Sequence, residues 1–549
     1  MANFASNYLR RKYTEIIMEI RNRLLDKDRN FFVLSICFLN SVYPVQLFFQ
    51  SHHSFMDRLS NGMSELWTVA VFAVLVSILL PKCFRYIYIF ISSVFFTADS
   101  FCYLKYNTVL DESLSDSLYN TNLGEVYEYL RQEIDTGYAL YIFFFIILVL
   151  VLLWFSKVIV LKINSSVYFR KGIILFFLLC FFLSNFFYIF KDRMVYEKSV
   201  FRVNSIPYYC ILLKNYLYNT DYSKVNGYLD EWSVSNNDLF ISEDINEDET
   251  QYVVYCIGES YSSHFASAYG YDLKTTPYLD ECRNKIIFSH AVAPESYTVG
   301  ALKRIGMISS GDGREYDDDK FYENGSIADA FRLAGWETCW ISNQNYGGAM
   351  GSIEKILAER CDKKSFTFKG GFWQGNIPYD EAVLPFIDDE ISDGKKMFFI
   401  HLMGSHFIPY ERYPDSFNFF RPADIEADTE NKREFIAWYL NSVLYNDYIM
   451  KKIADFFRDK NAVIVYLSDH GELVFNGRNN NDLGRGHKEI DPVVYDVPMI
   501  VWFSDIYKEK HGDRLNEIDK IKDDVFYTEN ISDVIFKAAG IRRKEELSN

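Results

Sequence analysis

The sequence predicts a transmembrane domain of five helices followed by an α/β domain with a mostly parallel sheet flanked by helices. Long apolar segments are crowded into the first 190 residues, and short apolar runs alternate with helical stretches after residue 251. One run, residues 462–467, is rich in β-branched side chains and stops abruptly at Ser468, Asp469 and His470. Ligands of open α/β sheets bind at the carboxyl ends of the strands, so Asp469 and His470 are expected to face a site, although a plain polar turn uses the same residue types.

The membrane prediction rests on five apolar segments, most of them near the roughly 20 residues that a helix needs to cross a bilayer. They cover residues 31–50, 66–80, 84–104, 138–160 and 171–190. The second is short and is expected to extend into its flanks. A buried core helix would explain any one of them, but five in so short a stretch favour a membrane domain.

The charges between these segments predict their orientation. Lys and Arg precede the first segment and lie between the second and third and between the fourth and fifth, whereas the loop at 105–137 is acidic. Because cytoplasmic loops retain basic residues, the N-terminus is expected inside and everything after residue 190 outside the cytoplasm. No cleavable signal peptide is expected, since the first 30 residues are charged and lack an apolar core followed by a cleavage site.

The composition changes twice along the chain. We expect a transmembrane domain at residues 1–191, an interfacial connector at 192–247 and a domain outside the cytoplasm at 248–549. The connector is rich in Tyr, Asn, Asp and Ser, which suits a membrane interface and suits a plain linker equally well.

Six short apolar runs and four longer stretches alternate in the last part, a pattern typical of a mostly parallel sheet covered by helices. The predicted strands are residues 252–257, 285–289, 337–341, 397–402, 462–467 and 499–503. The predicted helices are residues 325–334, 379–390, 433–458 and 531–539.

Charge and cysteine content exclude two classes of protein. The net charge of −17 argues against a nucleic-acid binder, so an anionic ligand must meet local positive charge such as a bound metal. The nine cysteines do not form a disulfide framework, although an oxidising compartment would allow Cys339 to pair with Cys361 and Cys210 with Cys282, and the sequence leaves the connectivity open.

Side chains of the kind that bind metals follow three of the predicted strands. Glu259 follows the first strand, His406 lies beyond the fourth, and Asp469 and His470 end the fifth. His401 lies within a strand, where packing is the more common role. Carboxylates and imidazoles together suit zinc or another borderline divalent ion, with one coordination position left for a nucleophile or substrate.

A loop further along adds His487, in the sequence Gly484-Arg-Gly-His487. The loop is rich in Gly and Asn and has the length to close back over a site at the sheet edge. The other histidines have no comparable setting, and we expect surface or packing roles for them.

The candidate nucleophiles precede a predicted helix. Ser296 and Thr298 lie in a loop that begins with Pro294. A hydroxyl at a helix N-terminus lies among unsatisfied backbone N–H groups, which favour an alkoxide or a phosphate. A plain N-cap explains the same residues.

Five motifs combine these features: Gly258-Glu-Ser260, Tyr269-Gly-Tyr-Asp-Leu-Lys-Thr-Thr-Pro-Tyr278, His401-Leu-Met-Gly-Ser-His406, Tyr410-Glu-Arg-Tyr-Pro414 and Ser468-Asp-His-Gly-Glu472. With residues 279–280 and 441–448, they resemble the phosphoethanolamine transferases of Gram-negative envelopes, which include lipid A modifying enzymes and mobile colistin-resistance enzymes. The resemblance covers both halves of the chain, because that family has five spans followed by a periplasmic domain of alkaline phosphatase or sulfatase type.

The resemblance implies that one catalytic zinc ion is bound by Glu259, Thr298, Asp469 and His470, and it leaves a second zinc ion open. It further implies that Thr298 is the nucleophile.

Two further histidines have a different role in the family that this sequence resembles. The resemblance implies that His406 and His487 meet the transferred phosphate or a second zinc.

The family mechanism implies the partners. Thr298 takes phosphoethanolamine from phosphatidylethanolamine, releases diacylglycerol, and passes the group to a lipid or glycan acceptor such as lipopolysaccharide. The expected setting is the bacterial inner membrane, with the chain acting as a monomer among membrane lipids and without nucleic acid.

Two departures from the lipid A enzymes leave the acceptor open. Residues 299–307 contain neither the cysteine nor the proline found after the nucleophile in those enzymes, and the interval from Asp469 to His487 is longer. Ser296 therefore stays as a reserve nucleophile. Lipid A, core sugars, a periplasmic glucan and a surface polysaccharide are all candidate acceptors.

Three other functions were weighed. A phosphoglycerol transferase of the lipoteichoic acid synthase type, using phosphatidylglycerol, has a similar architecture and uses a bound metal in the same way. A formylglycine sulfatase is disfavoured, because its Cys/Ser-x-Pro-x-Arg sequence is absent around Ser296. A membrane-tethered binding module without catalysis is disfavoured by the ordered set of metal-type residues.

Overall fold

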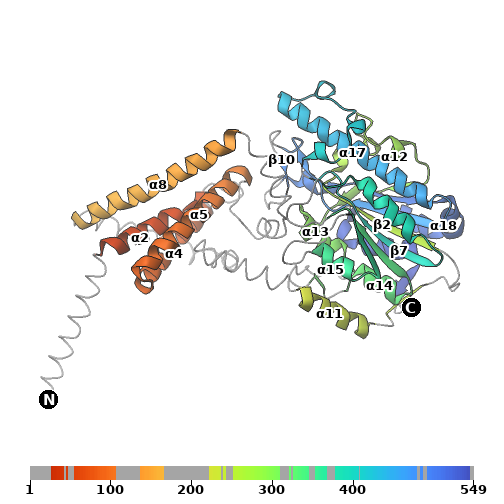
Figure 1. Ribbon diagram of the computed structural model, residues 1–549, viewed down its shortest axis with the longest axis horizontal. Helices are drawn as coiled ribbons and strands as arrows, with labels where there is room; N and C mark the ends of the chain where they lie inside the picture. Colours follow the sequence, from red (N-terminus) through yellow and green to blue (C-terminus); the bar gives the residue numbers. More distant parts are fainter. Residues whose placement is uncertain are drawn as a thin grey trace, which may run out of the picture. The chain divides into compact units, whose positions relative to one another are not determined.

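The chain divides into two compact units in the computed structural model (Figure 1). One comprises Met1–Glu112 with Ile134–Asn215, and the other comprises Ser113–Glu133 with Tyr216–Asn549. The structure describes residues 26–42, 45–46, 55–106, 136–165, 222–236, 239–242, 251–308, 321–322, 325–344, 353–367, 377–406, 408–478, 483–485 and 491–543.

The described part of the first unit is helical. Its helices are α2 (Lys27–Leu39), α4 (Phe55–Leu79), α5 (Lys82–Tyr106) and α8 (Thr136–Ser165). Asp26 caps α2 by accepting hydrogen bonds from the backbone N–H groups of Asp28 and Arg29. Phe32 and Ile36 of α2 are buried in one apolar cluster with Ala73 of α4.

Two helices among these residues are long and apolar enough to cross a membrane, over Lys82–Tyr103 and Phe143–Lys162. A shorter apolar stretch covers Val69–Leu79 in α4. Helix α8 exposes large apolar side chains such as Trp154, as a lipid-facing helix does. The predicted segment at 171–190 lies outside the described residues, so the count of five spans stays a prediction.

A seven-stranded mixed sheet forms the centre of the second unit, in the order β3-β12-β8-β2-β7-β5-β6. The strands are β2 (Gln251–Gly258), β3 (Lys285–Ile287), β5 (Glu337–Ser342), β6 (Lys363–Phe366), β7 (Lys395–His401), β8 (Ala462–Ser468) and β12 (Met499–Phe503). The strands from β8 to β6 run parallel, whereas β12 pairs antiparallel with both β8 and β3. The predicted, mostly parallel α/β sheet is therefore confirmed, with one antiparallel strand, β12, next to the edge strand β3.

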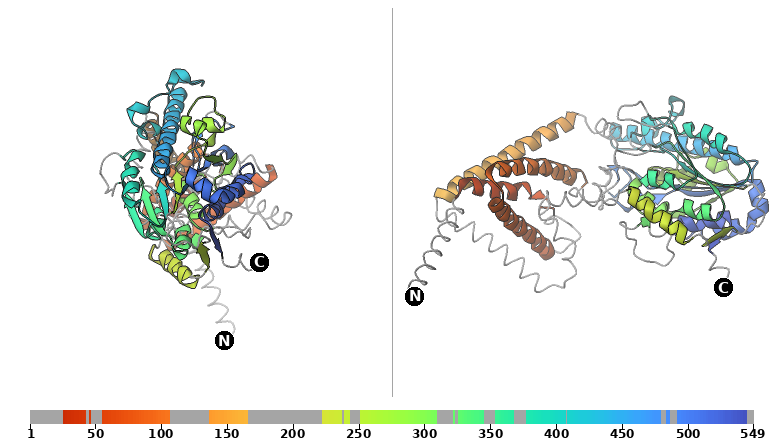
Figure 2. Two further views of the ribbon diagram at one scale, coloured as in Figure 1. Left: turned by 90° about the vertical axis from the view of Figure 1, so that its right-hand side faces the viewer. Right: turned by 60° about the horizontal axis from the view of Figure 1, so that its bottom comes forward.

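Helices cover both faces of this sheet (Figures 1 and 2). One face carries α13 (Thr298–Ile305), α14 (Ile327–Leu333), α15 (Ile353–Glu359), α18 (Asp505–Asp519) and α19 (Ile531–Ala539). The other carries α12 (Pro277–Glu281), α16 (Leu384–Glu390) and the long α17 (Glu430–Phe457). Three of the four predicted helices coincide with α14, α17 and α19, and α16 with a preceding 3₁₀ turn covers most of the fourth.

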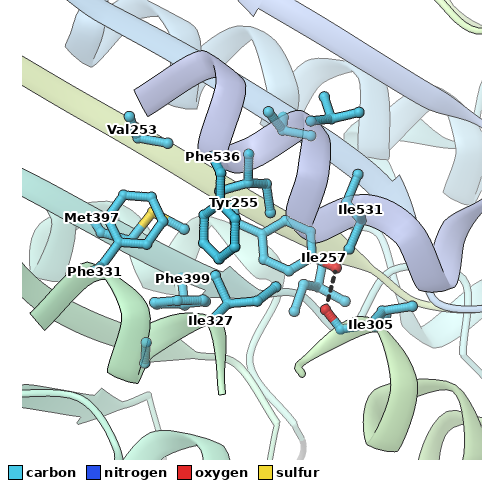
Figure 3. Packing of buried hydrophobic residues seen from close by; sticks show 14 of the residues in the cluster. Val253, Tyr255, Ile257, Ile305, Ile327, Phe331, Met397, Phe399, Ile531 and Phe536 are labelled. Carbon is cyan, nitrogen blue, oxygen red and sulfur yellow. Dashed lines mark hydrogen bonds between the residues drawn. The ribbon is translucent and has the colours of Figure 1, made fainter. Parts of the chain in front are cut away.

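Strand β2 is buried on both faces, which explains its unbroken apolar sequence. Tyr255 and Ile257 belong to the cluster under α14 and α19, where they pack near Phe331 and Phe536 (Figure 3). The Tyr255 hydroxyl donates a hydrogen bond to the Ile305 carbonyl at 3.3 Å. Alternate residues of β2 enter the cluster under α17, so this strand joins both cores.

Smaller elements complete the unit. They are α11 (Tyr222–Ser235), the pair β1 (Phe240–Ser242) and β14 (Ile541–Arg543), the pair β9 (Leu473–Val474) and β10 (Leu483–Gly484), and a sheet of β11 (Asp496–Val497), β4 (His290–Val292) and β13 (Val525–Tyr527). Cys339 and Cys361, which the sequence allowed to pair, are both buried free thiols. Cys282 is also a free thiol, and Cys210 lies outside the described residues.

A buried ion pair ties α11 and α14 to the residue after α15. Arg360 lies 2.6 Å from Asp230 and 2.7 Å from Asp329, and Asp329 is fully buried. Replacing Arg360 with methionine leaves the buried Asp329 carboxylate with only the partly exposed guanidinium of Arg332, 3.9 Å away, as a charge partner. We expect the free energy of unfolding to fall by about 3–5 kcal/mol, measured by denaturant unfolding of the full chain in detergent micelles.

The control for this prediction is Lys451→Met, which breaks an exposed pair with Asp455 on one face of α17. Such a pair stabilises by at most about 1 kcal/mol. Equal effects of Arg360→Met and Lys451→Met would contradict the prediction.

Candidate metal centre and nucleophile

The carboxyl ends of β2 and β8 lie side by side, because Gly258 is paired with Ser468 in the parallel register. The next residues along the two strands are Glu259 and Asp469, followed by His470. All three of these side chains are fully buried. The sheet thus brings together, at one edge, residues more than 200 positions apart.

Glu259, Asp469 and His470 form a cluster in which one ligand atom from each lies within 4.8 Å of the others. His470 Nε2 is 3.2 Å from Glu259 Oε1 and 3.4 Å from Asp469 Oδ2. The other ring nitrogen, Nδ1, lies 2.8 Å from the Gly471 carbonyl oxygen. A proton on Nδ1 donated to that carbonyl leaves the Nε2 lone pair directed at the cluster, the arrangement typical of a metal-binding histidine.

Thr298 lies against this cluster as the first residue of α13. Its hydroxyl donates a hydrogen bond to Glu259 Oε2 at 3.0 Å and lies 3.3 Å from His470 Nε2. Ser296, the reserve nucleophile, is buried two residues earlier and forms a side-chain hydrogen bond with Tyr495. The geometry therefore favours the hydroxyl of Thr298 over that of Ser296.

The electrostatics of the cluster fit a divalent cation. Burial and the negative charge of Glu259 raise the pKa of Asp469 to about 8. Burial also raises the pKa of Glu259, but the charges of His470, His406 and Arg485 outweigh it, and the net pKa is well below the ordinary value.

One carboxylate oxygen of the cluster has no donor within the part of the chain that the structure describes. Asp469 Oδ2 is buried and accepts no hydrogen bond from the described part of the chain. Ionising a buried carboxyl group that has an oxygen without a donor is costly, and coordination to a cation removes that cost. Two carboxylates and one imidazole are a donor set that zinc accepts.

Two further residues contact Glu259, and the sequence analysis missed both. The Gln344 amide donates to Glu259 Oε2 at 3.2 Å and to the Leu402 carbonyl at 3.0 Å. The buried Arg485 guanidinium lies 2.5 Å from Glu472 and 3.8 Å from Glu259 Oε1. Gln344 follows the end of β5 by two residues, so the strand-end argument that found Glu259 also applied to it.

The loop after β7 approaches the cluster closely. Gly404 has a φ of +56°, and a Cβ atom at this position would lie 2.6 Å from the Glu259 carbonyl oxygen. Buried Asp380 accepts hydrogen bonds from the backbone N–H groups of Met403 and Gly404 at 2.8 and 2.9 Å. The Ser405 N–H donates to the Glu259 carbonyl at 2.9 Å. The backbone of Glu259 is therefore held from a neighbouring loop.

His406 ends this loop and is buried near the cluster. Burial lowers its pKa well below the ordinary value, the charge of Arg485 lowers it further, and Glu259 acts in the opposite direction. Its contact with a phosphate or a second zinc stays a prediction. His487, the other residue predicted for this role, lies outside the described residues.

His401 packs as a core residue. Its ring lies edge-on to Trp340 at 6.0 Å, and neither ring nitrogen has a hydrogen bond within the described chain. Burial lowers its pKa to about 4. An unfolded histidine binds a proton near pH 6.5, so the native state loses stability as the pH falls from about 6.5 to 4.

Replacing His401 with leucine should remove this acid sensitivity. As the pH falls from 6.5 to 4, the free energy of unfolding of His401→Leu should rise relative to that of the wild type by about 1.4 kcal/mol per pH unit. The measurement is urea unfolding of both proteins at several pH values, with a chelator present so that metal release does not contribute. A stability difference that does not change with pH would contradict the prediction.

Comparison with known proteins places the two halves of the chain in the same group. The family model for "Phosphoethanolamine transferase EptA/EptB" matches residues 67–220, and the Sulfatase model matches residues 251–536, more than half of the chain. The chain is 27% identical over 288 residues to Escherichia coli (strain K12) phosphoethanolamine transferase EptC, covering 50% of this chain and 48% of the relative. It is 31% identical over 274 residues to Helicobacter pylori phosphoethanolamine transferase EptA, covering 48% and 49%.

These matches span about half the length of the curated relatives. A solved structure covers more. The integral membrane protein lipooligosaccharide phosphoethanolamine transferase A from Neisseria meningitidis matches 94% of this chain and 95% of its own, with a TM-score of 0.63 at 19% identity. That likeness supports a common fold for a membrane part and an α/β part.

Proposed function

The chain belongs to the phosphoethanolamine transferase family of the alkaline phosphatase superfamily, and on this premise we propose that it transfers phosphoethanolamine from phosphatidylethanolamine to an envelope lipopolysaccharide or glycan. The transfer proceeds in two steps through a covalent phosphoethanolamine–Thr298 intermediate. Curated relatives include a Kdo(2)-lipid A phosphoethanolamine 7''-transferase from Escherichia coli (strain K12), 29% identical over 280 residues.

One observation carries the proposal: the Thr298 hydroxyl contacts Glu259 at 3.0 Å and His470 at 3.3 Å, beside the Asp469 oxygen that has no hydrogen-bond donor among the described residues. A nucleophilic hydroxyl needs a group that removes or stabilises its proton, and both neighbours supply one. The start of α13 adds backbone N–H groups, which favour the negative charge of a phosphoryl group.

In the first step, the Thr298 oxygen forms a bond to the phosphorus of the lipid headgroup. The bond between phosphorus and the diacylglycerol oxygen breaks, and diacylglycerol leaves with a proton equivalent to the one that Thr298 lost. In the second step, an acceptor hydroxyl or phosphate oxygen attacks the same phosphorus, and Thr298 leaves and regains a proton. Splitting the transfer in this way replaces one difficult displacement by two easier ones.

Glu259, Asp469 and His470, with Thr298, are the residues that would hold a zinc ion. When bound, zinc lowers the pKa of a hydroxyl and polarises a phosphoryl oxygen. Arg485, held by Glu472, places a fixed positive charge beside Glu259, which suits a site for an anionic group.

The proposed donor is a membrane lipid, and this determines where in the cell the enzyme is proposed to act. We place the catalytic unit in the periplasm of a Gram-negative cell, anchored by five spans of the inner membrane at residues 1–191. Residues 192–247 are proposed as the connector and residues 248–549 as the catalytic domain. The enzyme is proposed to act as a monomer on lipids of the same membrane.

The experiment compares two donors with the same protein. The full chain is reconstituted with zinc in vesicles that contain headgroup-labelled phosphatidylethanolamine or phosphatidylglycerol, and labelled protein is quantified. Label from phosphatidylethanolamine alone supports the proposal. Label from phosphatidylglycerol alone would instead identify a phosphoglycerol transferase, and no label from either would reject both.

The acceptor requires a cellular measurement. Envelope glycolipids and glycans from cells with and without the gene are compared by mass spectrometry. We expect a phosphoethanolamine substituent on lipopolysaccharide or on an envelope glycan that appears only with the active gene. An unchanged envelope in cells that hold active enzyme would reject this acceptor class.

A further inference from the structure

Ser260, next to the cluster, has an unusual backbone conformation. Its φ is +56°, in the left-handed region that favours glycine, and its side chain is fully buried. A non-glycine residue in this region carries strain, and such residues gather where function requires a fixed geometry. The described contacts of Ser260 show what this conformation achieves.

Ser260 donates a hydrogen bond to each of the two carboxylates of the cluster. Its hydroxyl donates to Glu259 Oε1 at 2.6 Å, and its backbone N–H donates to Asp469 Oδ1 at 3.2 Å. Glu259 and Asp469 belong to different strands, so one residue fixes oxygens supplied by β2 and β8. The second oxygen of each carboxylate differs: Glu259 Oε2 accepts from Thr298 and Gln344, whereas Asp469 Oδ2 has no donor among the described residues.

The backbone conformation of Ser260 is stabilised by a residue of α17, the long helix that covers the sheet face opposite to α13. The Tyr439 hydroxyl of α17 donates to the Ser260 carbonyl at 2.7 Å and accepts from the Ser262 N–H at 2.9 Å. Tyr439 is itself fully buried. A hydroxyl that bonds to both Ser260 and Ser262 stabilises the turn that begins at the left-handed Ser260.

From these contacts we infer that Ser260 is a positioning residue of the metal centre: it fixes the side chains of Glu259 and Asp469 in the orientation in which both carboxylates face His470 Nε2 and can bind the cation. The inference rests on the proposed function only in that the cluster binds a divalent metal. Hydrogen bonds from outer residues fix the orientation of metal-binding carboxylates, and their loss typically weakens metal binding about 10- to 100-fold.

The test uses Ser260→Gly in the full chain in detergent micelles. Glycine adopts the same φ without strain and keeps the N–H, so this variant removes only the hydroxyl bond to Glu259. We expect zinc affinity, measured by competition with a fluorescent chelator, to fall about 10- to 100-fold. We also expect the visible absorption spectrum of the cobalt(II)-loaded protein to change, because that spectrum reports ligand geometry.

Two comparisons separate positioning from general damage. Ser262→Ala removes a buried hydroxyl two residues away that has no hydrogen bond in the described chain, and it should leave both readouts unchanged. Ser260→Ala lacks the hydroxyl and keeps the strained conformation, so it should lower thermal stability more than Ser260→Gly while weakening zinc binding equally.

The outcomes distinguish this inference from the proposed function. Wild-type zinc affinity and an unchanged cobalt spectrum in Ser260→Gly would overturn the positioning role, whatever the enzyme transfers. A wild type that binds zinc but never forms the phosphoethanolamine adduct would overturn the proposed reaction and leave the role of Ser260 intact. A wild type that binds neither ion would overturn both.

Discussion

Replacing Thr298 with alanine should lower phosphoethanolamine transfer by about 10³-fold or more, because the variant lacks the oxygen that forms the covalent bond. The hydroxyl lost is the one that contacts both Glu259 and His470. Alanine is a good helix former, so α13 should begin as before and the protein should remain folded. The measurement is the rate of diacylglycerol release from phosphatidylethanolamine vesicles, with melting temperature as the check on folding.

Two variants control this result. Thr298→Ser keeps a hydroxyl at the same position and should retain much of the activity. Ser296→Ala removes the reserve nucleophile, whose side chain bonds to Tyr495, and should remain active. An active Thr298→Ala together with an inactive Ser296→Ala would show that Ser296, and not Thr298, is the nucleophile.

Replacing Asp469 with asparagine should separate metal binding from folding. The asparagine carbonyl can still accept from the N–H groups of Ser260 and His470, which lie 3.2 and 2.7 Å from Asp469 Oδ1. The change removes a carboxyl group whose ionisation beside Glu259 is unfavourable, since burial and that neighbouring charge raise the pKa of Asp469 to about 8. The metal-free variant should therefore melt at the same temperature as the metal-free wild type or higher.

Zinc should stabilise the wild type much more than it stabilises Asp469→Asn. Zinc at 100 times its dissociation constant should stabilise the wild type by about 2.7 kcal/mol, since it binds the folded state. Asp469→Asn should gain little, because a coordinating oxygen is lost and zinc binding should weaken by more than the roughly 10- to 100-fold cost of losing an outer contact. Thermal unfolding with chelator and with zinc measures both effects.

Asp447→Asn is the matched control. Asp447 is also a buried aspartate, but its two oxygens accept the N–H groups of Tyr278 and Leu279 at the start of α12. Asparagine has only one such acceptor, so this variant should lose stability while keeping its response to zinc. Equal zinc responses in Asp469→Asn and the wild type would contradict the metal assignment.

The parts of the fold that the sequence predicted are those set by local patterning. The apolar runs at 252–257 and 462–467 became β2 and β8 within a residue at either end, because strands buried on both faces need unbroken apolar sequence. Their parallel pairing then put Gly258 opposite Ser468 and made Glu259 and Asp469 neighbours. The strand-end argument works because it depends on the direction of strands alone.

Other features depend on tertiary contacts that patterning does not encode. Strand β12 has the same kind of apolar sequence as the parallel strands, yet it pairs antiparallel with β8. Arg485 lies in a Gly- and Asn-rich loop with no strand-end pattern to mark it, and only the folded chain puts its guanidinium near Glu259. The role of Ser260 depends on a left-handed φ and on Tyr439 from a distant helix, and neither is visible in the motif Gly258-Glu-Ser260.

The central claim is that Thr298 carries phosphoethanolamine during the reaction. The most direct measurement incubates the zinc-loaded full chain with phosphatidylethanolamine, stops the reaction in acid, and locates the modified residue by tandem mass spectrometry of peptides. We predict a phosphoethanolamine group on Thr298 that disappears when an acceptor is added and never forms in Thr298→Ala. An adduct on Ser296 or any other residue, or its absence from active wild-type enzyme, would contradict the claim.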